Sequence, residues 1–354
     1  MTMKKLKIGI IGVGNISSAH IDGYLKNPHC ELYALCDTDE RTLAKKGAKY
    51  NISRLFSDHK TMLKSLPELD AVSVCTSNIA HAECTIDCLR AGKHVFCEKP
   101  MALNAEQALK MKAEAEKAQK TLGIGFVRRY GKDAELAREL VGDGKTGELY
   151  YAKSSYIRRN GNPGGWFADR SLSGGGPLID LGVHIIDLVR YIAGNPKPVS
   201  VYGATFTKLY DRRNLKDTKI YLSESEDNRV CDVEDLAAAM IRFENGFVLN
   251  VDTSYSLNVA EDSGKTEIFG TKGGIKIDPE LSFYTEYEDR LANISFPSRP
   301  IFDGSEYARE IDDFVNAVLT GQTTRATADD GVQIMRILDA IYESARTGHE
   351  IILH

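Results

Sequence analysis

The sequence lacks several features that mark specialised classes of protein. Its seven cysteines contain no CxxC pair, and the chain has no block of like charge, no internal repeat and no low-complexity tract. The net charge of −5, with both signs interspersed, argues against a nucleic-acid partner. An odd number of scattered cysteines favours buried thiols in a reducing cytoplasm over disulfides or a metal site, so we expect no metal.

Long apolar runs are also lacking, since the longest have the length of a strand and fall far short of a membrane span. The start, MTMKKLKIGIIG, is basic but has no small-residue cleavage site. We therefore expect a cytoplasmic protein with no signal peptide and no membrane partner. A length of 354 residues exceeds what one hydrophobic core usually serves, which predicts two domains.

The first 127 residues alternate between short β-rich runs and helix-like stretches. The clearest helix, 104–120, begins at an Asn cap and is rich in helix formers. This alternation predicts a doubly wound parallel sheet, that is, a Rossmann domain over residues 1–127. The predicted strands are 7–12, 31–37, 71–76, 94–99 and 121–127.

Residues 128–354 have a different sequence pattern, with longer predicted strands and turn residues between them. Asn245-Gly246 joins two β-rich runs and predicts a hairpin, and Gly273-Gly274 predicts a second one. We expect an α+β domain with a large, open, mainly antiparallel sheet. Its other predicted features are helices at 132–142, 305–319 and 328–346 and a charged, exposed excursion at 211–229.

A glycine turn follows the first predicted strand. In GVGNISSAH, Gly12 and Gly14 lie where a strand gives way to a helix, and Ser17 replaces the third glycine of the dinucleotide-binding pattern. The first glycine permits the turn, and the second lets the backbone approach a pyrophosphate at the helix N-terminus. The third position serves close packing, which a serine approximates. The same turn also occurs in α/β domains without a dinucleotide.

Asp37 ends the next strand about 20 residues later, as the dinucleotide-binding pattern requires. Its carboxylate suits the ribose hydroxyls and repels a 2′-phosphate, so NAD is favoured over NADP, although Arg41 one turn later weakens this preference. The candidate cofactor contacts belong to the turn, the strand ends and the domain junction. They are Gly12, Gly14, Asn15, Ile16, Asp37, Thr76, Asn78, His81, Glu98, Lys99 and Arg128.

Two later strands end in polar residues, at the end of a parallel sheet where ligands bind. Thr76 and Asn78 are candidate cofactor contacts or helix caps, and His81 is as readily structural as functional. The strand HVFCEK ends in Glu98 and Lys99, before a proline. A lone Lys-Pro is usually a surface turn, but the apolar strand and the adjacent glutamate make a lysine that points toward the cofactor an equal alternative.

The segment GGGPLIDLGVHIID carries Asp180, His184 and Asp187 at i, i+4 and i+7, which predicts one polar stripe on an apolar helix. Buried polar groups need partners, so we interpret the stripe as the wall of an active site, with the glycines leaving room for a loop and a ligand. In the alternative account, Asp180 interacts with the helix dipole, Asp187 pairs with Arg190, and His184 is a core histidine.

A long glycine-rich loop precedes this helix and carries Tyr156, Arg158, Arg159 and the single tryptophan, Trp166. Such loops often act as lids, and aromatic and arginine side chains suit a sugar. Trp166 serves equally well as an anchor of the loop to the core. Arg128 and Arg129, near the domain junction, are further candidates, one of which we expect to meet substrate or cofactor.

The glycine turn, the strand ending in Asp37, the AGKHVFCEKP block and the GGGPLIDLGVHIIDLVRYI segment occur in this order. Together they resemble the Gfo/Idh/MocA oxidoreductases. The similarity extends to ADDGVQIMRILDAIYESARTG and covers essentially the whole chain, and Ser17 is the one departure that we note. It implies a Rossmann domain and a C-terminal α/β domain whose open sheet often forms the oligomer interface, hence a homo-oligomer that is either a dimer or a tetramer. It does not specify the substrate.

By this resemblance, Lys99 matches the lysine of the EKP motif, and Asp180 and His184 match the DxGxH motif. Oxidation of a hydroxyl needs a base of near-neutral pKa, which suits His184. Lys99 would stabilise the developing alkoxide and keep His184 deprotonated, and Asp180 would hold a hydroxyl. Tyr156, Arg158 and Trp166 complete the expected substrate site, and the nicotinamide performs the hydride chemistry.

The expected function is NAD-dependent hydride transfer at a secondary hydroxyl of a sugar, a sugar derivative or a cyclitol. A second hypothesis is redox-assisted glycoside cleavage, in which NAD transiently oxidises a ring hydroxyl and then returns the hydride. The same Lys99 and His184 would serve both reactions. A third hypothesis is a non-catalytic NAD(H)-binding regulator, which has no evident need for the complete set of catalytic residues.

Overall fold

The computed structural model describes residues 5–209, 212, 215, 230–278, 280–296 and 305–353. The chain forms two compact units. Unit 1 contains residues 1–127 and 304–332, and unit 2 contains residues 128–303 and 333–354. Apart from Arg212 and Leu215, the excursion predicted at 211–229 lies outside the described residues.

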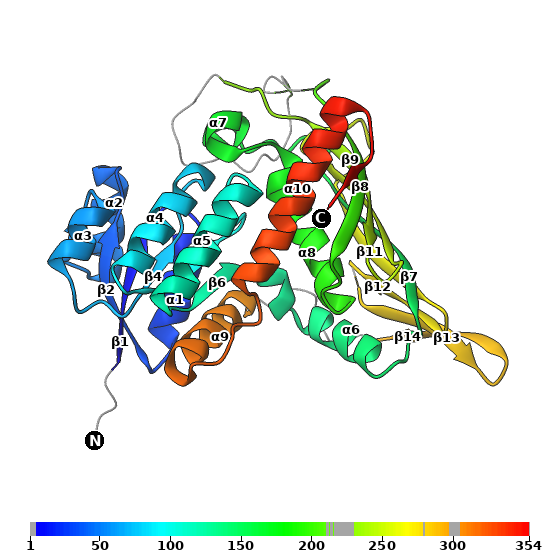
Figure 1. Ribbon diagram of the computed structural model, residues 1–354, viewed down its shortest axis with the longest axis horizontal. Coiled ribbons are helices and arrows are strands. Elements are labelled where there is room, and N and C mark those ends of the chain that lie inside the picture. The colour runs from blue at the N-terminus through cyan, green and yellow to red at the C-terminus, as the bar shows by residue number, and fades with distance from the viewer. Residues whose placement is uncertain are drawn as a thin grey trace. The chain divides into compact units, whose positions relative to one another are not determined.

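Unit 1 is built on a six-stranded parallel sheet with the order β3-β2-β1-β4-β5-β6 (Figure 1). The strand order reverses between β1 and β4, which is the point where ligands bind in doubly wound sheets. The strands are β1 (Leu6–Ile11), β2 (Cys30–Cys36), β3 (Leu55–Phe56), β4 (Ala71–Val74), β5 (His94–Glu98) and β6 (Leu122–Gly125). The helices between them are α1 (Ser17–Lys26), α2 (Glu40–Tyr50), α3 (His59–Ser65), α4 (Asn78–Arg90) and α5 (Ala105–Ala118). The predicted Rossmann fold is confirmed.

Local signals explain several of these elements. Asn104 caps α5, where its side chain accepts a hydrogen bond from the Gln107 backbone at 2.9 Å. The central strands are buried on both faces, as parallel strands covered by helices are. Their continuous apolar runs, rather than an alternation of polar and apolar residues, predicted this burial.

Helix α9 (Glu306–Thr320) belongs to unit 1, although the predicted division assigned residues 305–319 to the C-terminal domain. It packs on α1, where Gly23 leaves space for it: a Cβ there would lie 2.9 Å from Ile311. Ile311 joins the hydrophobic core of the unit, and Asn27 donates a 2.7 Å hydrogen bond to Asp312. Because these contacts span almost 300 residues of sequence, no local pattern predicts them.

Unit 2 contains a nine-stranded mixed sheet with the order β14-β13-β12-β11-β7-β10-β9-β8-β15. Its pairings are antiparallel except for the parallel pair of β7 and β10. The strands are β7 (Leu149–Ile157), β8 (Pro198–Phe206), β9 (Leu236–Phe243), β10 (Val248–Ser254), β11 (Ser263–Gly270), β12 (Gly273–Ile277), β13 (Ser282–Tyr287), β14 (Arg290–Ser295) and β15 (Ile351–Ile352). The expected open, mainly antiparallel sheet is confirmed.

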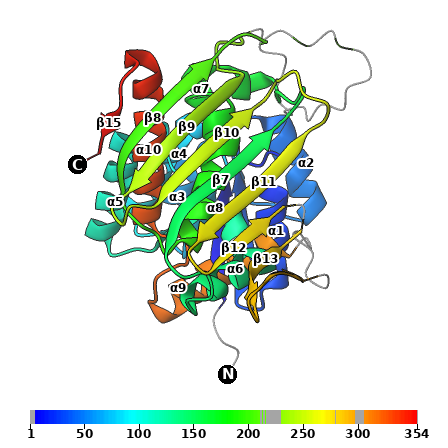
Figure 2. The ribbon, with the colours of Figure 1, turned by 90° about the vertical axis from the view of Figure 1, so that its right-hand side faces the viewer.

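Helices of unit 2 pack on one face of this sheet, and Figure 2 shows the other face with no helix in front of it. These helices are α6 (Lys132–Gly142), α8 (Val183–Ile192) and the C-terminal part of α10 (Ala328–Thr347). A short helix, α7 (Arg170–Ser173), precedes α8 in the chain. α8 carries the predicted His184 and packs against β7 and β10. The sheet therefore supports the helix that bears candidate catalytic groups.

The two predicted hairpins differ in outcome. β9 and β10 pair around the turn at Asn245-Gly246, with Gly246 at a φ of 84°, as predicted. The second turn lies at Thr271-Lys272, and Gly273 and Gly274 begin β12 instead of forming the turn. Packing explains the glycine at position 273, since a Cβ there would lie 2.6 Å from Phe283 of the neighbouring strand.

Within the part of the chain that the structure describes, one helical segment, Arg170–Ile192, is long and apolar enough to cross a membrane by length and composition alone. Its most apolar window is 78% buried inside the protein, as in the core helix of a folded domain. The segment also contains Asp180 and Asp187, whose side chains have partners within unit 2.

Candidate active site

The glycine turn of unit 1 has the conformation that the dinucleotide-binding pattern requires. Gly12 has a φ of 84°, and a Cβ there would lie 2.6 Å from the Cys75 backbone. A Cβ on Gly14, by contrast, would meet no heavy atom within 4 Å, so the side of Gly14 where a side chain would stand is open. Ser17 is fully buried and donates a 2.6 Å hydrogen bond to the Gly14 carbonyl, which explains how a serine replaces the third glycine.

Asp37 holds this turn against the end of β2. Its carboxylate accepts hydrogen bonds from the backbone N–H of Val13 at 2.7 Å and of Asp39 at 2.9 Å. Each carboxylate oxygen has a second lone pair, so both oxygens retain the capacity to accept a ribose hydroxyl. The turn, the open side of Gly14 and this carboxylate fit the adenosine side of a nicotinamide dinucleotide.

Lys46, on α2, is a further charged group at the turn that the sequence did not single out. Its ammonium group lies 3.1 Å from the Gly14 carbonyl and 2.5 Å from the Ser18 hydroxyl. A cation at this position favours the negative charge of a pyrophosphate. Lys46 lies 32 residues after Gly14 in the sequence, so the spacing of the glycine motif does not point to it.

The ends of β4 and β5 carry the other predicted cofactor residues of unit 1. Asn78 is buried at the first turn of α4, and the Thr76 hydroxyl donates to the Ser77 carbonyl at 3.1 Å. The ring nitrogens of His81 lie 2.7 Å from the Pro100 carbonyl oxygen and 3.1 Å from the Thr76 carbonyl oxygen. His81 is thus engaged with the protein backbone, which is the structural interpretation left open for it.

Glu98 is buried, and its carboxylate is held within unit 1. One oxygen lies 2.8 Å from the His20 Nε2, and the other accepts a 3.0 Å hydrogen bond from the Lys99 backbone. Although burial raises the pKa of Glu98, the hydrogen bond and charge of His20 bring it below its usual range. The half-buried Lys99 follows directly, before a cis peptide bond to Pro100.

In unit 2, Asp180 lies in a π-helical turn, Leu178–Gly182, that leads directly into α8. Such turns shift the side chains of a helix and frequently occur at functional sites. The hydroxyl of Tyr255, just after β10, donates a 2.9 Å hydrogen bond to the Asp180 carboxylate. The sequence did not identify Tyr255, because 75 residues separate it from its partner.

Two predicted substrate residues, Tyr156 and Arg158, lie beside this contact. The Arg158 guanidinium is 5.5 Å from the centre of the Tyr156 ring and 6.0 Å from that of Tyr255. Burial and then the negative charge of Asp180 raise the pKa of Tyr255 well above its usual value. The phenol therefore stays protonated and acts as a donor, and the cluster combines a carboxylate, a guanidinium and two aromatic rings.

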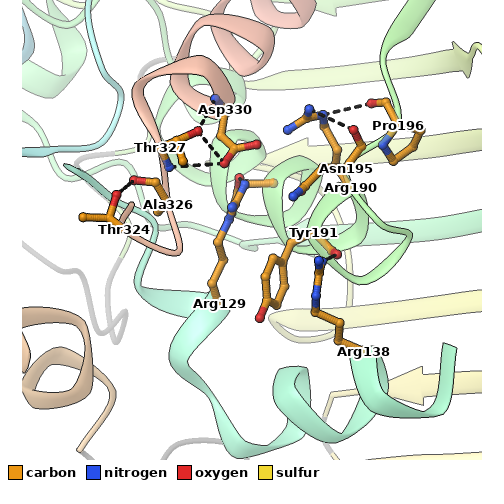
Figure 3. A network of polar contacts seen from close by, with 11 residues as sticks. Arg129, Arg138, Arg190, Tyr191, Asn195, Pro196, Thr324, Ala326, Thr327 and Asp330 are labelled. Atoms are coloured by element: carbon orange, nitrogen blue, oxygen red, sulfur yellow. Dashed lines mark hydrogen bonds and ion pairs between the residues drawn. The ribbon is translucent and has the colours of Figure 1, made fainter. Parts of the chain in front are cut away.

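Asp187 belongs to a different contact from Asp180. It accepts two hydrogen bonds from Arg129, at 2.9 and 2.6 Å, and both side chains are fully buried. Figure 3 shows Arg129 beside Tyr191, whose ring centre lies 5.0 Å from the guanidinium, and shows Arg190 donating to the carbonyls of the loop after α8. The three residues of the predicted polar stripe therefore do not form one site. Asp187 forms a buried ion pair in the core, whereas Asp180 contacts Tyr255.

Arg128, predicted as a cofactor contact, forms an ion pair of 3.1 Å with Asp278 in unit 2. Arg159 donates to the Ala260 carbonyl, and its backbone N–H donates to Asp262. Trp166 lies in the short helix Gly165–Ala168, where its ring stacks on Phe167 with a centroid distance of 3.8 Å. The paired rings form an aromatic surface on the loop.

The glycines that precede the π-turn have a packing role that differs from the expected one. A Cβ on Gly175 would overlap the Tyr342 hydroxyl, and one on Gly176 would overlap the Glu234 carbonyl. The buried Glu234 carboxylate accepts hydrogen bonds from the Gly176 and Leu178 backbone at 3.0 and 3.2 Å and from Tyr342 at 2.9 Å. The protein itself fills the space that we expected to accommodate a loop and a ligand.

One cluster among the described residues has the composition of a metal site. His59, Glu83 and Asp87 place their ligand atoms within 4.8 Å of one another. The Lys60 ammonium lies 2.7 Å from Glu83 and 3.5 Å from Asp87, so a side-chain cation already balances these carboxylates. We assign no metal to it.

The predicted catalytic residues are divided between the units: Lys99 lies in unit 1, and Asp180 and His184 lie in unit 2. Contacts within unit 1 support the backbone at Lys99, and contacts within unit 2 support Asp180. Sequence reasoning missed the partners that come from distant segments, namely His20, Lys46, Glu234, Tyr255 and Tyr342. A polar residue inside an apolar stretch is the only local signal that some of them give.

Comparisons with known proteins agree with this architecture. Residues 6–126 match the model of the oxidoreductase family with an NAD-binding Rossmann fold, and residues 138–353 match that of the C-terminal alpha/beta domain of the same oxidoreductase family. Together the two matches cover both units.

Several relatives are named as sugar or cyclitol dehydrogenases or reductases. The chain is 34% identical to the D-glucoside 3-dehydrogenase of Escherichia coli K12, over 99% of this chain and 98% of that protein. It is 28% identical to the myo-inositol 2-dehydrogenase of Thermotoga maritima, over 92% of each. The crystal structure of aldose-aldose oxidoreductase from Caulobacter crescentus, complexed with glycerol, superimposes with a TM-score of 0.82 at 28% identity, covering 99% of this chain and 100% of that one.

Proposed function

This chain belongs to the Gfo/Idh/MocA family of oxidoreductases, and we propose that it transfers a hydride between NAD and a secondary hydroxyl of a sugar, a sugar derivative or a cyclitol. The observation that carries the proposal is the contact between Asp180 and Tyr255, one helical turn from His184. An ionised carboxylate with a fixed donor beside it is suited to bind one hydroxyl of a polyol. A histidine on the same helix is suited to accept the proton of the reacting hydroxyl.

Unit 1 supplies the residues that would hold the cofactor. We assign the pyrophosphate to the turn of Gly12, Gly14, Asn15 and Ile16, and the adenosine ribose to Asp37. We assign the nicotinamide side to Thr76, Asn78, Glu98 and Lys99 at the strand ends, with His81 supporting the backbone there. Arg128 of unit 2 is a further candidate. NAD is favoured over NADP because the Asp37 carboxylate would repel a 2′-phosphate. When bound, the nicotinamide supplies the hydride acceptor.

Lys99 and His184 form the proposed proton-transfer pair. His184 accepts the proton of the substrate hydroxyl at its ring, because histidine alone has an ordinary pKa close to neutrality. The Lys99 ammonium stabilises the developing alkoxide and disfavours a second positive charge on His184. Asp180 holds a neighbouring hydroxyl, and Tyr255 fixes the orientation of that carboxylate.

The rest of the cluster in unit 2 and the aromatic pair on the preceding loop support the proposed substrate class. Arg158 presents guanidinium donors to sugar hydroxyls, and Tyr156 lies beside it. The stacked Trp166 and Phe167 offer an aromatic surface of the kind that packs on the apolar face of a sugar ring. We propose that the substrate is a glycoside or an inositol, which are the types of compound named for two of the relatives.

The test is turnover of purified protein with NAD and a panel of glucosides, free sugars and inositols, followed by NADH absorbance. His184→Ala should lower turnover by roughly 10²–10⁴-fold, the usual contribution of a general base, and should leave NADH binding intact. His349→Ala, at an exposed position near the C-terminus, is the matched control and should behave as the wild type. Normal turnover of the best substrate by His184→Ala would contradict the assignment.

Product analysis separates the alternatives. Release of the aglycone without net NADH formation indicates redox-assisted glycoside cleavage by the same residues. Binding of NADH without turnover of any member of the panel indicates a regulator. Net NADH formation with a ketosugar or an inosose as product supports the proposed dehydrogenase.

A further inference from the structure

Two buried histidines of unit 1 contact the residues on either side of Lys99, His20 through a side-chain carboxylate and His81 through a backbone carbonyl. His20 lies in α1 and His81 in α4, and their exposed fractions are 0% and 1%. His20 reaches Glu98, the residue before Lys99, and His81 reaches Pro100, the residue after it. Neither histidine has a role in the proton transfer proposed above.

The His20 contacts form a chain of buried polar groups that ends at Lys99. The hydroxyl of Tyr24 lies 2.8 Å from that of Ser73, which lies 3.3 Å from the His20 Nδ1. The His20 Nε2 lies 2.8 Å from one Glu98 oxygen, and the other oxygen accepts the Lys99 backbone N–H. A carboxylate accepts only, so the His20 Nε2 carries the proton of this contact.

The His81 ring lies between the ends of two neighbouring strands. Nδ1 lies 2.7 Å from the Pro100 carbonyl oxygen, and Nε2 lies 3.1 Å from the Thr76 carbonyl oxygen, just after β4. Both partners accept only, and a neutral imidazole has one N–H, so the shorter contact to Pro100 takes the first proton. His81 therefore donates to the turn after Lys99, and its second ring nitrogen lies against the end of the neighbouring strand.

We propose that His20, acting through Glu98, and His81 are positioning residues that fix the backbone on both sides of Lys99 and thereby the location of its ammonium group. The inference rests on the proposed function of Lys99. A lysine side chain has four rotatable bonds. Its ammonium group can be held at one position only if its backbone is fixed as well. Catalytic groups tolerate errors of only about 0.5 Å, and a 1 Å displacement costs up to about 10²-fold in rate.

Amide substitutions test the two contacts separately, because asparagine places its nitrogen near Nδ1 of histidine and glutamine places its nitrogen near Nε2. His81→Asn keeps a donor for Pro100, whereas His81→Gln loses it. His20→Gln keeps a donor for Glu98, whereas His20→Asn loses it. The proposal predicts a crossed pattern, with kcat roughly tenfold lower in His81→Gln and His20→Asn than in their partner variants, and KM for the sugar changed much less.

A second measurement needs no turnover. Acetic anhydride labelling of the full-length protein without substrate, with each lysine quantified by peptide mass spectrometry, reports the environment of Lys99. Labelling of Lys99 should be several-fold faster in His81→Gln and His20→Asn than in the other two variants. Lys93, which is buried and donates to the Pro67 carbonyl in the same unit, should not change.

His94→Gln is the matched control, because His94 lies at the opposite end of β5, where its Nδ1 accepts from the Thr121 backbone at 3.1 Å. It should leave both kcat and Lys99 labelling unchanged. Equal values of kcat and labelling in all four variants, or the reverse pattern, would overturn the proposal. If no sugar or cyclitol is turned over, the proposed function fails, and the labelling pattern still decides whether the histidines position Lys99.

Discussion

The Tyr255 hydroxyl donates a 2.9 Å hydrogen bond to the Asp180 carboxylate, from the end of β10 to the π-turn before α8. The phenol is fully buried and its pKa is raised, so it is a permanent donor. The contact fixes the carboxylate that we assign to substrate binding, in the unit that also carries His184.

Removal of this donor tests the role of Tyr255. Tyr255→Phe keeps the ring and loses a hydrogen bond to a charged group, which is worth about 1.5–3 kcal/mol. We expect kcat/KM for the best sugar substrate to fall by roughly tenfold or more, with NADH affinity unchanged. Steady-state kinetics and NADH fluorescence titration measure both quantities. Unchanged kcat/KM would mean that Asp180 needs no fixed orientation.

Asp37 has two roles that two substitutions separate. Asp37→Asn keeps an acceptor for the Val13 backbone but removes the charge, so the ratio of NADPH to NADH affinity should rise. Asp37→Ala also removes the acceptor that holds the glycine turn, so the affinity for both cofactors should fall. Fluorescence titration with NADH and NADPH provides the comparison. An unaltered ratio in Asp37→Asn would show that the carboxylate does not select the cofactor.

The buried pair of Arg129 and Asp187 should be essential for stability and not for chemistry. Asp187→Ala leaves the guanidinium buried without its carboxylate partner, which typically costs about 3–5 kcal/mol. The double variant Arg129→Met with Asp187→Leu should recover much of this loss, because two apolar side chains need no charge partner. Urea unfolding gives the free energies. A cost below about 1 kcal/mol for Asp187→Ala would contradict the structural role.

His94 should make unit 1 less stable in acid. Burial, and then the nearby Lys120, lower the pKa of His94 from 6.5 to about 4 in the folded protein. Its contribution to stability is therefore fully present above pH 6.5, the unfolded value, and is lost as the pH falls toward 4. In His94→Gln the free energy of unfolding should vary less with pH in this window. Identical pH profiles for the two proteins would refute this contribution.

The helix-free face of the unit 2 sheet is the surface that we propose for a homo-oligomer. Tyr202 and Met240 are exposed neighbours on β8 and β9, with exposed fractions of 54% and 43%. The double variant Tyr202→Glu with Met240→Glu places like charges directly opposite each other and should lower the native mass to that of the 39.1 kDa monomer. Light scattering after gel filtration measures the mass. A monomeric wild type would contradict the oligomer.

The sequence predicted what local patterns encode. Apolar strands alternating with capped helices predicted the parallel sheet of unit 1, and the Asn245-Gly246 turn predicted one hairpin. Gly273 was misassigned because its reason, the Phe283 ring on the next strand, is a tertiary contact. Local sequence favours glycine both in turns and where side chains leave no space, so it cannot separate the two causes.

Candidate site residues show the same division. Asp180, His184 and Lys99 stand out because they interrupt apolar elements. Their supporting residues do not, since Tyr255 lies 75 residues from Asp180, and His20 lies 78 from Glu98. Arg129 and Asp187, 58 residues apart, form a core ion pair, although the spacing of Asp187 suggested the same stripe as Asp180.

The central claim is hydride transfer from a carbon that bears a secondary hydroxyl to the nicotinamide. It is tested most directly with methyl glucoside deuterated at C3 and myo-inositol deuterated at C2, incubated with NAD and analysed by mass spectrometry of the recovered nicotinamide. We predict deuterium in the reduced nicotinamide from at least one of these substrates, with transfer abolished in His184→Ala. The account would be contradicted if protein that binds NADH transferred no deuterium to the cofactor from either substrate, nor from deuterated forms of the other glucosides, free sugars and inositols in the panel.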